Sequence, residues 1–227
     1  MAKHKRVLDV IGVIGELLIT AGVLLLLYVA WQLGVNDPVV SNVQQQQAQQ
    51  APISTPVEKQ FKDADKSLKQ GKVFGRIYIP RFKNDYVRQI GQGTFQKITL
   101  NTIGVGHYVS SQWPGQEGNF AVAAHRTSHG APFNKIDTLQ DGDNVYVETN
   151  DGWFTYTYRQ TAIVDPTAIE VIDKVPVGMT GAKAGGHYMT MTSCHPKWSN
   201  KQRIVVWLEQ TNQSAIMPWE LKQVLGK

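Results

Sequence analysis

Residues 190–196 read Thr190-Met191-Thr192-Ser193-Cys194-His195-Pro196 and hold the only cysteine of the chain. The run before Cys194 is rich in threonine and alternates as a β-strand does, and Pro196 ends it. Because one cysteine cannot form an internal disulfide, its sulfur is either a small buried hydrophobe or a reactive thiol. The stretch therefore predicts a strand with a single thiol near its end.

Two other segments bring further chemistry toward this thiol. Arg203 opens an apolar run at residues 203–208, and the short connection after Pro196 predicts an antiparallel return that places Arg203 beside Cys194. A third apolar run, residues 120–124, ends at His125 and is followed by a turn-rich segment. A histidine at a strand exit is a candidate general acid or base.

These motifs resemble those of the sortases, transpeptidases of the Gram-positive cell surface. The resemblance covers residues 72–209, and its motifs are the Thr-x-Thr-x-Cys segment, residues 118–126, the Gly-Ala-Pro-Phe at 130–133, and Arg203. Residues 106–108, 119–122 and 194–196 are most similar to class E, the housekeeping type of high-GC actinobacteria. Sortases usually read Thr-Leu-x-Thr-Cys, so Met191 and Ser193 are departures. Methionine nearly keeps the volume of leucine and serine keeps the hydroxyl, so they bear on substrate fit rather than on the nucleophile.

The resemblance implies a mainly β fold, a closed eight-stranded sortase-type β-barrel with short helices. It also implies that Cys194 is the nucleophile, His125 the acid and base, and Arg203 the group that holds the oxyanion. The expected substrate-binding residues are Tyr108, Thr192, Ser193, His195 and Arg126. Tyr108 matches a family tyrosine linked to the choice of Leu-Ala-x-Thr-Gly over Leu-Pro-x-Thr-Gly. No metal and no cofactor is expected.

The reaction that the resemblance implies is cleavage of a sorting signal between threonine and glycine. A thioester acyl-enzyme forms on the cysteine, and an amine of the peptidoglycan precursor then releases the protein onto the wall. With ordinary pKa values of about 8.5 for cysteine and 6.5 for histidine, only about 1% of uncoupled pairs are thiolate with imidazolium. That form is nonetheless competent, because the imidazolium can protonate the departing amine. An arginine offers a rigid, permanently charged fork for the oxyanion.

The hydrophobic pattern from residue 72 onward is mostly that of short strands, and seven or eight of them in one domain favour a closed barrel. A short helix is expected at residues 132–139 and a terminal helix at 216–225. The predicted strands are residues 73–79, 86–90, 119–125, 143–149, 153–164, 187–193 and 203–209.

The amino-terminal part predicts a membrane anchor. Residues 10–33 are apolar apart from Glu16, Thr20 and Gln32, and as a helix they cover about 36 Å against a bilayer core of roughly 30 Å. A basic cluster within the cytoplasmic tail, residues 1–9, places the rest of the chain outside the cell. A cleaved signal peptide is the alternative, but no small-x-small cleavage pair follows the run.

The remaining boundaries follow from composition and capping signals. Residues 34–55 predict a glutamine-rich linker with too little apolar surface to fold alone. A capping box at Thr55 predicts a helix over residues 56–71. The sortase β-barrel catalytic domain is expected at residues 72–210, followed by a carboxy-terminal extension at 211–227. The expected location is therefore the cell membrane, with a single span and the catalytic domain extracellular.

The sequence also bears on several functions other than that of a sortase. The net charge of +5 comes without a basic stripe interleaved with aromatics, which argues against nucleic acid as a partner. A metal module built from Cys194, His195, His125 and His129 lacks paired ligand spacing. An L,D-transpeptidase would need a cysteine where Ala131 stands. A noncatalytic membrane-anchored surface protein and a class C pilin-polymerising sortase remain as alternatives.

Overall fold

The computed structural model describes residues 2–50, 53 and 70–226. The chain divides into two compact units, Met1–Val39 and Val40–Lys227. The helix predicted at residues 56–71 lies, up to residue 69, outside the described residues.

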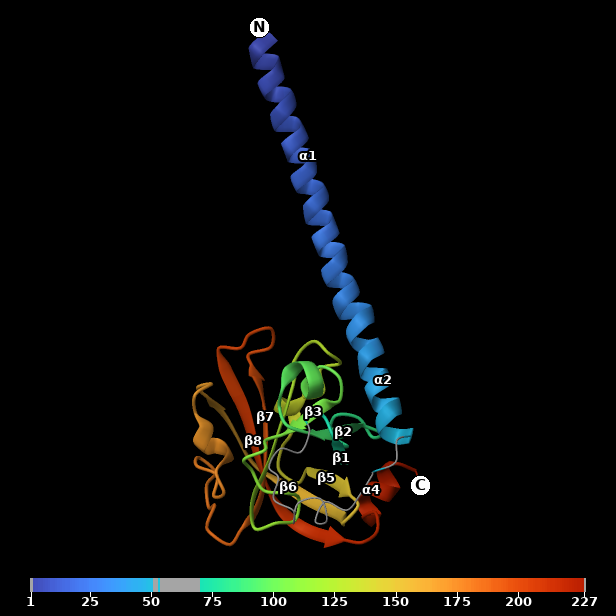
Figure 1. Cartoon of the computed structure of the whole chain (residues 1–227), viewed down its shortest axis with the longest axis vertical. Helices are drawn as coiled ribbons and strands as arrows, with labels where there is room; N and C mark the ends of the chain where they lie inside the picture. The colour runs from blue at the N-terminus through green and yellow to red at the C-terminus, as the bar shows by residue number, and fades with distance from the viewer. Residues whose placement is uncertain (1, 51–52, 54–69, 227) are drawn as a thin grey trace. The chain divides into compact units, whose positions relative to one another are not determined.

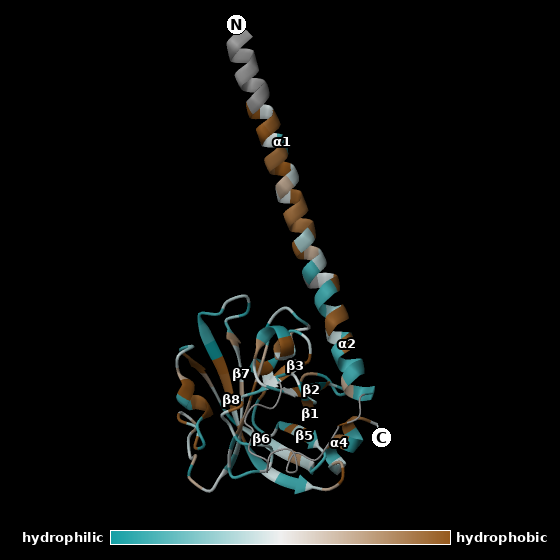
Figure 2. Ribbon diagram, viewed as in Figure 1, coloured by the Kyte–Doolittle hydropathy of each residue, from teal (hydrophilic) through white to brown (hydrophobic). Residues whose placement is uncertain are grey.

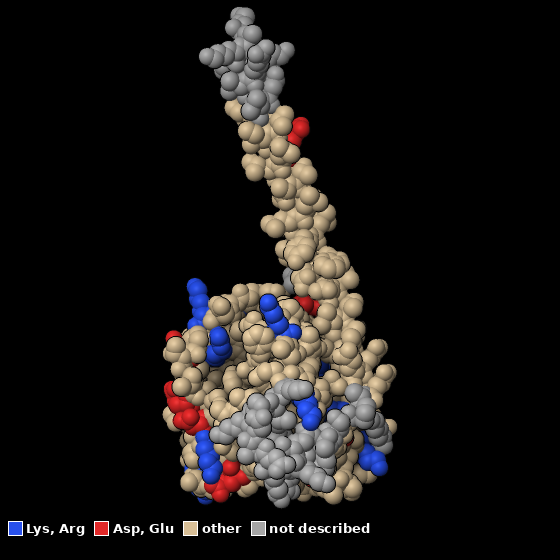
Figure 3. All heavy atoms as spheres, viewed as in Figure 1, with Lys and Arg blue, Asp and Glu red and all other residues tan. Residues whose placement is uncertain are grey.

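The first unit is helical. α1 runs over Ala2–Trp31 and continues through the π-helical segment η1 (Gln32–Asn36) into α2 (Asp37–Gln50). From Ile11 onward this helix is long and apolar enough to cross a membrane, as the hydropathy colouring shows (Figure 2). Between Ile11 and Trp31 its one charged residue is Glu16. Figure 3 shows that most of the described surface of this helix carries neither acidic nor basic side chains. The helix therefore has the length and composition that a bilayer core requires.

The second unit contains a closed β-barrel, which confirms the predicted fold class (Figure 1). Around the barrel the strand order is β1-β2-β3-β4-β7-β8-β6-β5, with β2–β3 and β4–β7 parallel and the other pairs antiparallel. Closure leaves no long unpaired edge. In the part of the chain that the structure describes, the strands are β1 (Val73–Tyr78), β2 (Val87–Gln92), β3 (Gly104–His107), β4 (Gly118–Ala124), β5 (Asn144–Thr149), β6 (Gly152–Val164), β7 (His187–His195) and β8 (Gln202–Ser214).

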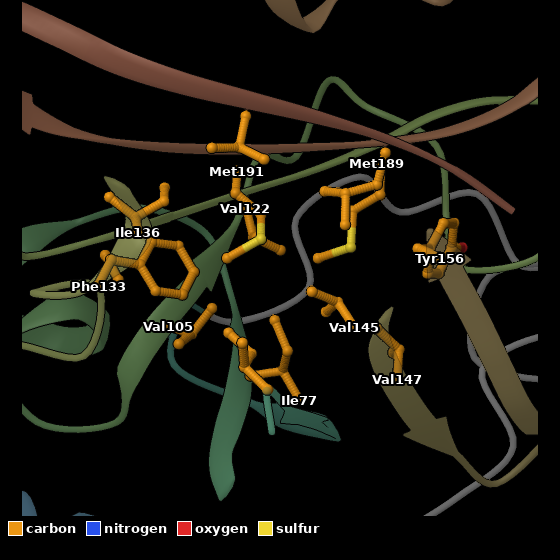
Figure 4. Close-up of a cluster of buried hydrophobic side chains, with 14 of the residues drawn as sticks. Ile77, Val105, Val122, Phe133, Ile136, Val145, Val147, Tyr156, Met189 and Met191 are labelled. Atoms are coloured by element: carbon orange, nitrogen blue, oxygen red, sulfur yellow. The ribbon is translucent and has the colours of Figure 1, made fainter. Parts of the chain in front are cut away.

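Alternation along the strands divides their side chains between the inside and the outside of the barrel. Met189 and Met191 of β7 are fully buried in the interior cluster, where Val122 of β4 joins them (Figure 4). Because successive strand residues point to opposite faces, Thr190 and Thr192 lie on the outer face. The same period makes the interior of the barrel a packed apolar core rather than a channel.

The outer face of β7 and β8 is covered by the long connection from β6 to β7. This connection includes the 3₁₀ turn η4 (Ile169–Ile172), and Val171 packs with Val205 and Trp207 in a second buried cluster. The connection therefore forms a wall over the outside of the barrel, next to the strands that were predicted to carry the chemistry.

The structure contains one strand, β3, that the sequence did not predict, and it changes the bounds of two predicted helices. β3 has four residues, two of them glycine, which have low β propensity, so nothing in the local pattern marks it. The helix expected at residues 132–139 is a series of turns that ends in the 3₁₀ turn η3 (Ile136–Thr138). The terminal helix expected at 216–225 is α4 (Trp219–Val224), anchored by the buried Leu221.

The segment predicted as a linker, residues 34–55, is helical as far as Gln50. From Val40 onward this helix belongs to the second unit, and Gln44 and Ala48 are buried. The side chain of Gln44 donates a hydrogen bond to the backbone carbonyl of His129, and that of Gln45 donates one to the carbonyl of Asp85. The prediction of a linker was therefore wrong for residues 37–50. A helix is usually recognised in a sequence by its apolar stripe, whereas glutamine side chains hold α2 to the barrel through hydrogen bonds.

His107, the last residue of β3, is fully buried and serves as a hydrogen-bonded structural residue. Its Nδ1 lies 2.8 Å from Gln92 Oε1, and its Nε2 lies 3.0 Å from both the Gln112 carbonyl and Ser111 Oγ. Burial lowers the pKa of His107 from 6.5 to about 3, although the bond to the Gln112 carbonyl opposes this shift. The ring is therefore neutral in the folded protein over the physiological range.

This burial predicts a loss of stability in mild acid. Because the folded pKa of His107 lies below the unfolded value, the unfolded chain binds the extra proton first, and stability falls as the pH drops from 6.5 toward 3. The slope from one such group reaches about 1.4 kcal/mol per pH unit. The variant His107→Gln should be less stable at pH 7 yet show a flatter slope between pH 6 and 4 in urea unfolding. Equal slopes for the two proteins would contradict this account.

Candidate active site

Three neighbouring strands bring the predicted catalytic residues to one rim of the barrel. In the antiparallel pair of β7 and β8, Cys194 is the direct register partner of Arg203, as the short connection predicted. In the parallel pair of β4 and β7, Ala123 is the partner of Thr192. Continuing that register by two residues puts His125, just beyond β4, level with Cys194. Cysteine, histidine and arginine are thus adjacent across the sheet although they are far apart in the sequence.

The three residues also belong to the same face of the sheet. Val122, Met191 and Ile204 point into the core. His125, Cys194 and Arg203 lie an odd number of residues from them on the same chain segments, so alternation places them on the outer face. Each of the three is half-buried, and Cys194 is a free thiol. The rim therefore presents a thiol, an imidazole and a guanidinium on the outer face of the sheet.

A groove runs beside this rim. Val205 and Val164 lie on its strand side and the connection from β6 to β7 on the other, with Arg203 among its polar groups. Its full lining is Tyr108, Val164, Asp165, Pro166, Ala168, Ile169, Val171, Ile172, Thr192, Arg203 and Val205. A mostly apolar wall with a few polar groups is typical of a site for a short peptide or small ligand.

Buried hydrogen bonds fix the loop that walls the groove. The side chain of Asn119 on β4 donates to the carbonyl of Asp173 at 3.0 Å and accepts from Thr190 Oγ1 at 2.8 Å. The indole of Trp207 donates to the carbonyl of Val171 at 3.2 Å. Because these partners lie on adjacent strands, the barrel sets the position of the wall.

Tyr108 and Thr192, two of the predicted substrate-binding residues, line the groove together. The Tyr108 hydroxyl lies 2.9 Å from Thr192 Oγ1. Burial raises the pKa of Tyr108, while the bond to Thr192 and the charge of Arg203 lower it and Cys194 raises it further. Tyr108 therefore lines the groove and is close enough to Cys194 and Arg203 for their charges to affect its hydroxyl group.

The other predicted substrate-binding residues are placed differently. Ser193 is buried and donates a hydrogen bond of 2.8 Å to the carbonyl of Ala124, so it joins β7 to β4 under the site. Arg126 is 2% exposed, donates to the Asn134 carbonyl and pairs with Asp137, so it holds the loop after β4. His195 is half-buried at the end of β7 and does not line the groove.

Arg203 is held by the loop between β7 and β8. Its Nη1 donates to the carbonyls of Asn200 at 2.9 Å and Gln202 at 3.0 Å. Both contacts come from one end of the guanidinium. The two bonds therefore restrain the guanidinium of Arg203, which is one of the residues that line the groove.

His125 has a partner that the sequence did not reveal. Its Nε2 lies 2.8 Å from Asn101 Oδ1, and its ring centroid lies 5.0 Å from that of His129. Asn101 is 24 residues earlier in the chain, in the turn after the π-helical segment η2 (Gln96–Leu100). No local pattern distinguishes it from other turn asparagines, so only the fold could identify it.

Metal chemistry was one of the alternatives that the histidines and the cysteine raised. Among the residues that the structure describes, no group of three or more His, Cys, Asp or Glu side chains is arranged to hold a metal ion.

A closed barrel with a cysteine, a histidine and an arginine together at one rim has the side chains that a sortase-type site requires. The family model "Sortase domain" matches residues 77–211. Sortase SrtE1 of Streptomyces coelicolor is 36% identical over 86% of this chain and 55% of its own length. Sortase SrtE2 of the same organism is 33% identical over 88% of this chain and 81% of its own length.

Solved structures agree with these relatives. Sortase E from Streptomyces avermitilis matches with a TM-score of 0.61 and 35% identity, over 67% of this chain and 99% of that one. Sortase E1 from Streptomyces coelicolor, solved with a tripeptide in the active site, matches with a TM-score of 0.60 and 34% identity, over 63% and 90%. The chain belongs to the sortase family, whose members are cysteine transpeptidases, and these relatives are consistent with class E.

Proposed function

We propose that this protein is a membrane-anchored class E sortase that cleaves a Leu-Ala-x-Thr-Gly or Leu-Pro-x-Thr-Gly sorting signal and transfers the acyl group to an amine of a peptidoglycan precursor. The observation that supports it most is the register of β7 and β8, which pairs Cys194 with Arg203 beside an apolar groove. The chain spans 55% of the length of one curated relative and 81% of the other, and it includes every residue of this site.

The first half of the proposed reaction is acylation. The Cys194 thiolate attacks the carbonyl carbon of the substrate threonine, and the carbonyl oxygen becomes an oxyanion next to the Arg203 guanidinium. Collapse of this intermediate breaks the bond between carbon and nitrogen, and His125 as imidazolium gives its proton to the departing glycine amine. The products are a thioester on Cys194, a free amino terminus and a neutral imidazole.

The second half of the reaction reverses these roles. The neutral His125 accepts a proton from the incoming amine as that amine attacks the thioester carbonyl. Arg203 again faces the oxyanion, and its collapse expels the Cys194 thiolate with a new amide bond. Thiolate and imidazolium are both restored, so one pair of residues serves both steps without any further proton donor.

The groove accounts for the proposed peptide selectivity. Tyr108 and Thr192 are joined by a hydrogen bond in its lining, and most of the other lining residues are aliphatic. A small alanine at the second position of the signal leaves room beside the tyrosine ring, whereas proline adds bulk and fixes φ. We therefore expect alanine to be preferred to proline.

A pair of peptides tests this function. The full chain in detergent, given a simple amine as acceptor, should cleave Leu-Ala-Glu-Thr-Gly between threonine and glycine with a kcat/KM at least about tenfold above that for Leu-Pro-Glu-Thr-Gly, which corresponds to about 1.4 kcal/mol. Intact cells that express the chain should cleave the added peptide too, because the catalytic domain faces outward. Absence of cleavage and of a Cys194 thioester with both peptides would leave the noncatalytic surface protein as the better description.

The class C pilin polymerase has less support. The relatives above 30% identity that match more than half of this chain are E-type sortases. The Asp-Pro pair at Asp37 and Pro38, which would be its lid motif, lies in α2 and begins that helix. A joining reaction that uses a protein lysine in preference to a small amine would favour class C.

A further inference from the structure

We propose that Asn101 and Gln44 are positioning residues for His125, so that the amino-terminal helix α2 contributes to the acid–base step. This inference rests on the proposed function, because it assumes that His125 transfers the protons.

Asn101 sets the tautomer of His125. An amide oxygen can only accept a hydrogen bond, so the contact of 2.8 Å between His125 Nε2 and Asn101 Oδ1 requires the proton to be on Nε2. In the neutral ring the basic nitrogen is then Nδ1, so proton transfer is assigned to that atom. The same bond persists in the imidazolium, where both nitrogens carry protons. Asn101 therefore holds the ring in one orientation through the whole cycle.

Gln44 reaches both backbone segments that support this arrangement. Its side chain is 2% exposed, and its Nε2 donates to the carbonyl of Thr102 at 3.4 Å and to that of His129 at 3.2 Å. Thr102 follows Asn101 directly. His129 carries the ring that faces His125. One buried amide thus joins the turn that orients the imidazole to the loop that packs on it.

The backbone around Gln44 is shaped to admit it. A Cβ on Gly130 would lie 2.7 Å from Gln44 Oε1, and one on Gly104 would lie 3.0 Å from the same atom. The loop that Gln44 contacts is strained, because Ser128, His129 and Ala131 have positive φ values of 63°, 49° and 42°. Strained backbone at a functional site persists only when its surroundings hold it. The bond from Gln44 to the His129 carbonyl is one such restraint.

The pH dependence of His125 depends on its surroundings as well as on Asn101. The titratable or charged side chains on its own loop are Arg126, His129, Lys135 and Asp137, and those on neighbouring elements include Cys194 and His195 of β7, Arg203 of β8, Tyr108 and Lys97 of η2. All of them stay in place when Asn101 is changed, so a shift that follows substitution at Asn101 reports on that contact.

The test uses the full chain in detergent and the alanine peptide of the preceding section. Asn101→Leu should lower kcat at least about tenfold with little change in KM, because the ring is no longer oriented. Asn101→Asp keeps an acceptor for the Nε2 proton and adds a negative charge, so it should recover most of kcat. It should also move the acidic limb of the pH profile to higher pH, since an adjacent carboxylate raises the pKa of a histidine. A purely structural role for Asn101 would produce no such recovery or shift.

Gln44 is tested by coupling. Gln44→Met keeps the length of the side chain but removes the donor, and it should lower kcat severalfold in the wild type and much less in the Asn101→Leu background. The matched control is Gln45→Met on the same helix. This change removes bonds to Asp85 and Arg88 but none to the Thr102 or His129 carbonyls, so it should leave kcat unchanged. Melting temperatures of all variants separate these effects from loss of folding.

The outcomes are distinguishable. If the wild type does not cleave the peptide, the proposed function fails. If the wild type is active and Asn101→Leu retains its kcat, or Asn101→Asp leaves the acidic limb in place, the role of Asn101 is overturned. If Asn101→Leu does not fold, the pH profile of Asn101→Asp alone decides. If Gln44→Met behaves like Gln45→Met, or adds fully to Asn101→Leu, the role of Gln44 is overturned.

Discussion

Replacing Cys194 by alanine should abolish peptide cleavage and leave the barrel intact. Loss of a covalent nucleophile costs about 10⁴-fold or more in kcat, because the remaining groups can only bind and polarise the substrate. The fold should tolerate the change, since Cys194 is half-buried next to the end of β7 and lies outside the interior cluster. Chromatographic assay of the peptide products gives the rate, and circular dichroism with a thermal melt reports the fold.

Ser193→Ala is the matched control for this substitution. It changes the neighbouring residue, removes the hydrogen bond to the Ala124 carbonyl, and should cost about 1 kcal/mol of stability while the thioester still forms. The two variants thus separate chemistry from folding at adjacent positions of one strand. Transpeptidation by Cys194→Ala near the wild-type rate would refute the assignment of the nucleophile.

The positions of the three proposed catalytic residues could be predicted because each lies where a strand begins or ends. Pro196 and the short connection to Arg203 leave few ways to fold other than an antiparallel return, and the register bears this out. His125 follows a strand whose apolar residues are continuous, and parallel pairing with β7 brings its end to the same rim. Local pattern and strand geometry together were sufficient for these positions.

The supporting residues could not be predicted in the same way. Asn101 meets His125 only because β3, a glycine-rich strand without a sequence signal, carries the preceding turn to the barrel rim. Gln44 lies in a glutamine-rich run that has the composition of a linker, and its role depends on backbone carbonyls supplied by two distant loops. Contacts between a side chain and a distant backbone carbonyl leave no periodic trace in the sequence.

Ser193 and Arg126 show a related limit. Both are next to catalytic residues in the chain, which made them candidates for substrate binding. Alternation turns Ser193 away from Cys194, and Arg126 is drawn to Asp137 and to the Asn134 carbonyl. A place in a motif therefore predicted proximity to the proposed site, whereas the strand period decided which side chains lie on the outer face of the sheet.

Arg203→Lys should lower kcat/KM at least about 100-fold, or about 2.7 kcal/mol of transition-state stabilisation, although the charge is kept. The guanidinium bonds to the carbonyls of Asn200 and Gln202 through Nη1, and Arg203 also lines the groove. An ammonium is a single point of charge, so it cannot hold both loop carbonyls and also stay fixed opposite the oxyanion. Because the oxyanion exists only after attack, the loss should fall mainly on kcat.

Arg159→Lys provides the comparison for the Arg203 variant. Arg159 is an arginine of β6 that pairs with Glu209 at the surface, and a lysine there should change kcat/KM less than about twofold, since exposed ion pairs contribute little. Steady-state kinetics on the alanine peptide measures both variants under one set of conditions. A change of less than about threefold in Arg203→Lys would mean that Arg203 only holds the loop between β7 and β8, and the oxyanion would then need another donor at the same rim.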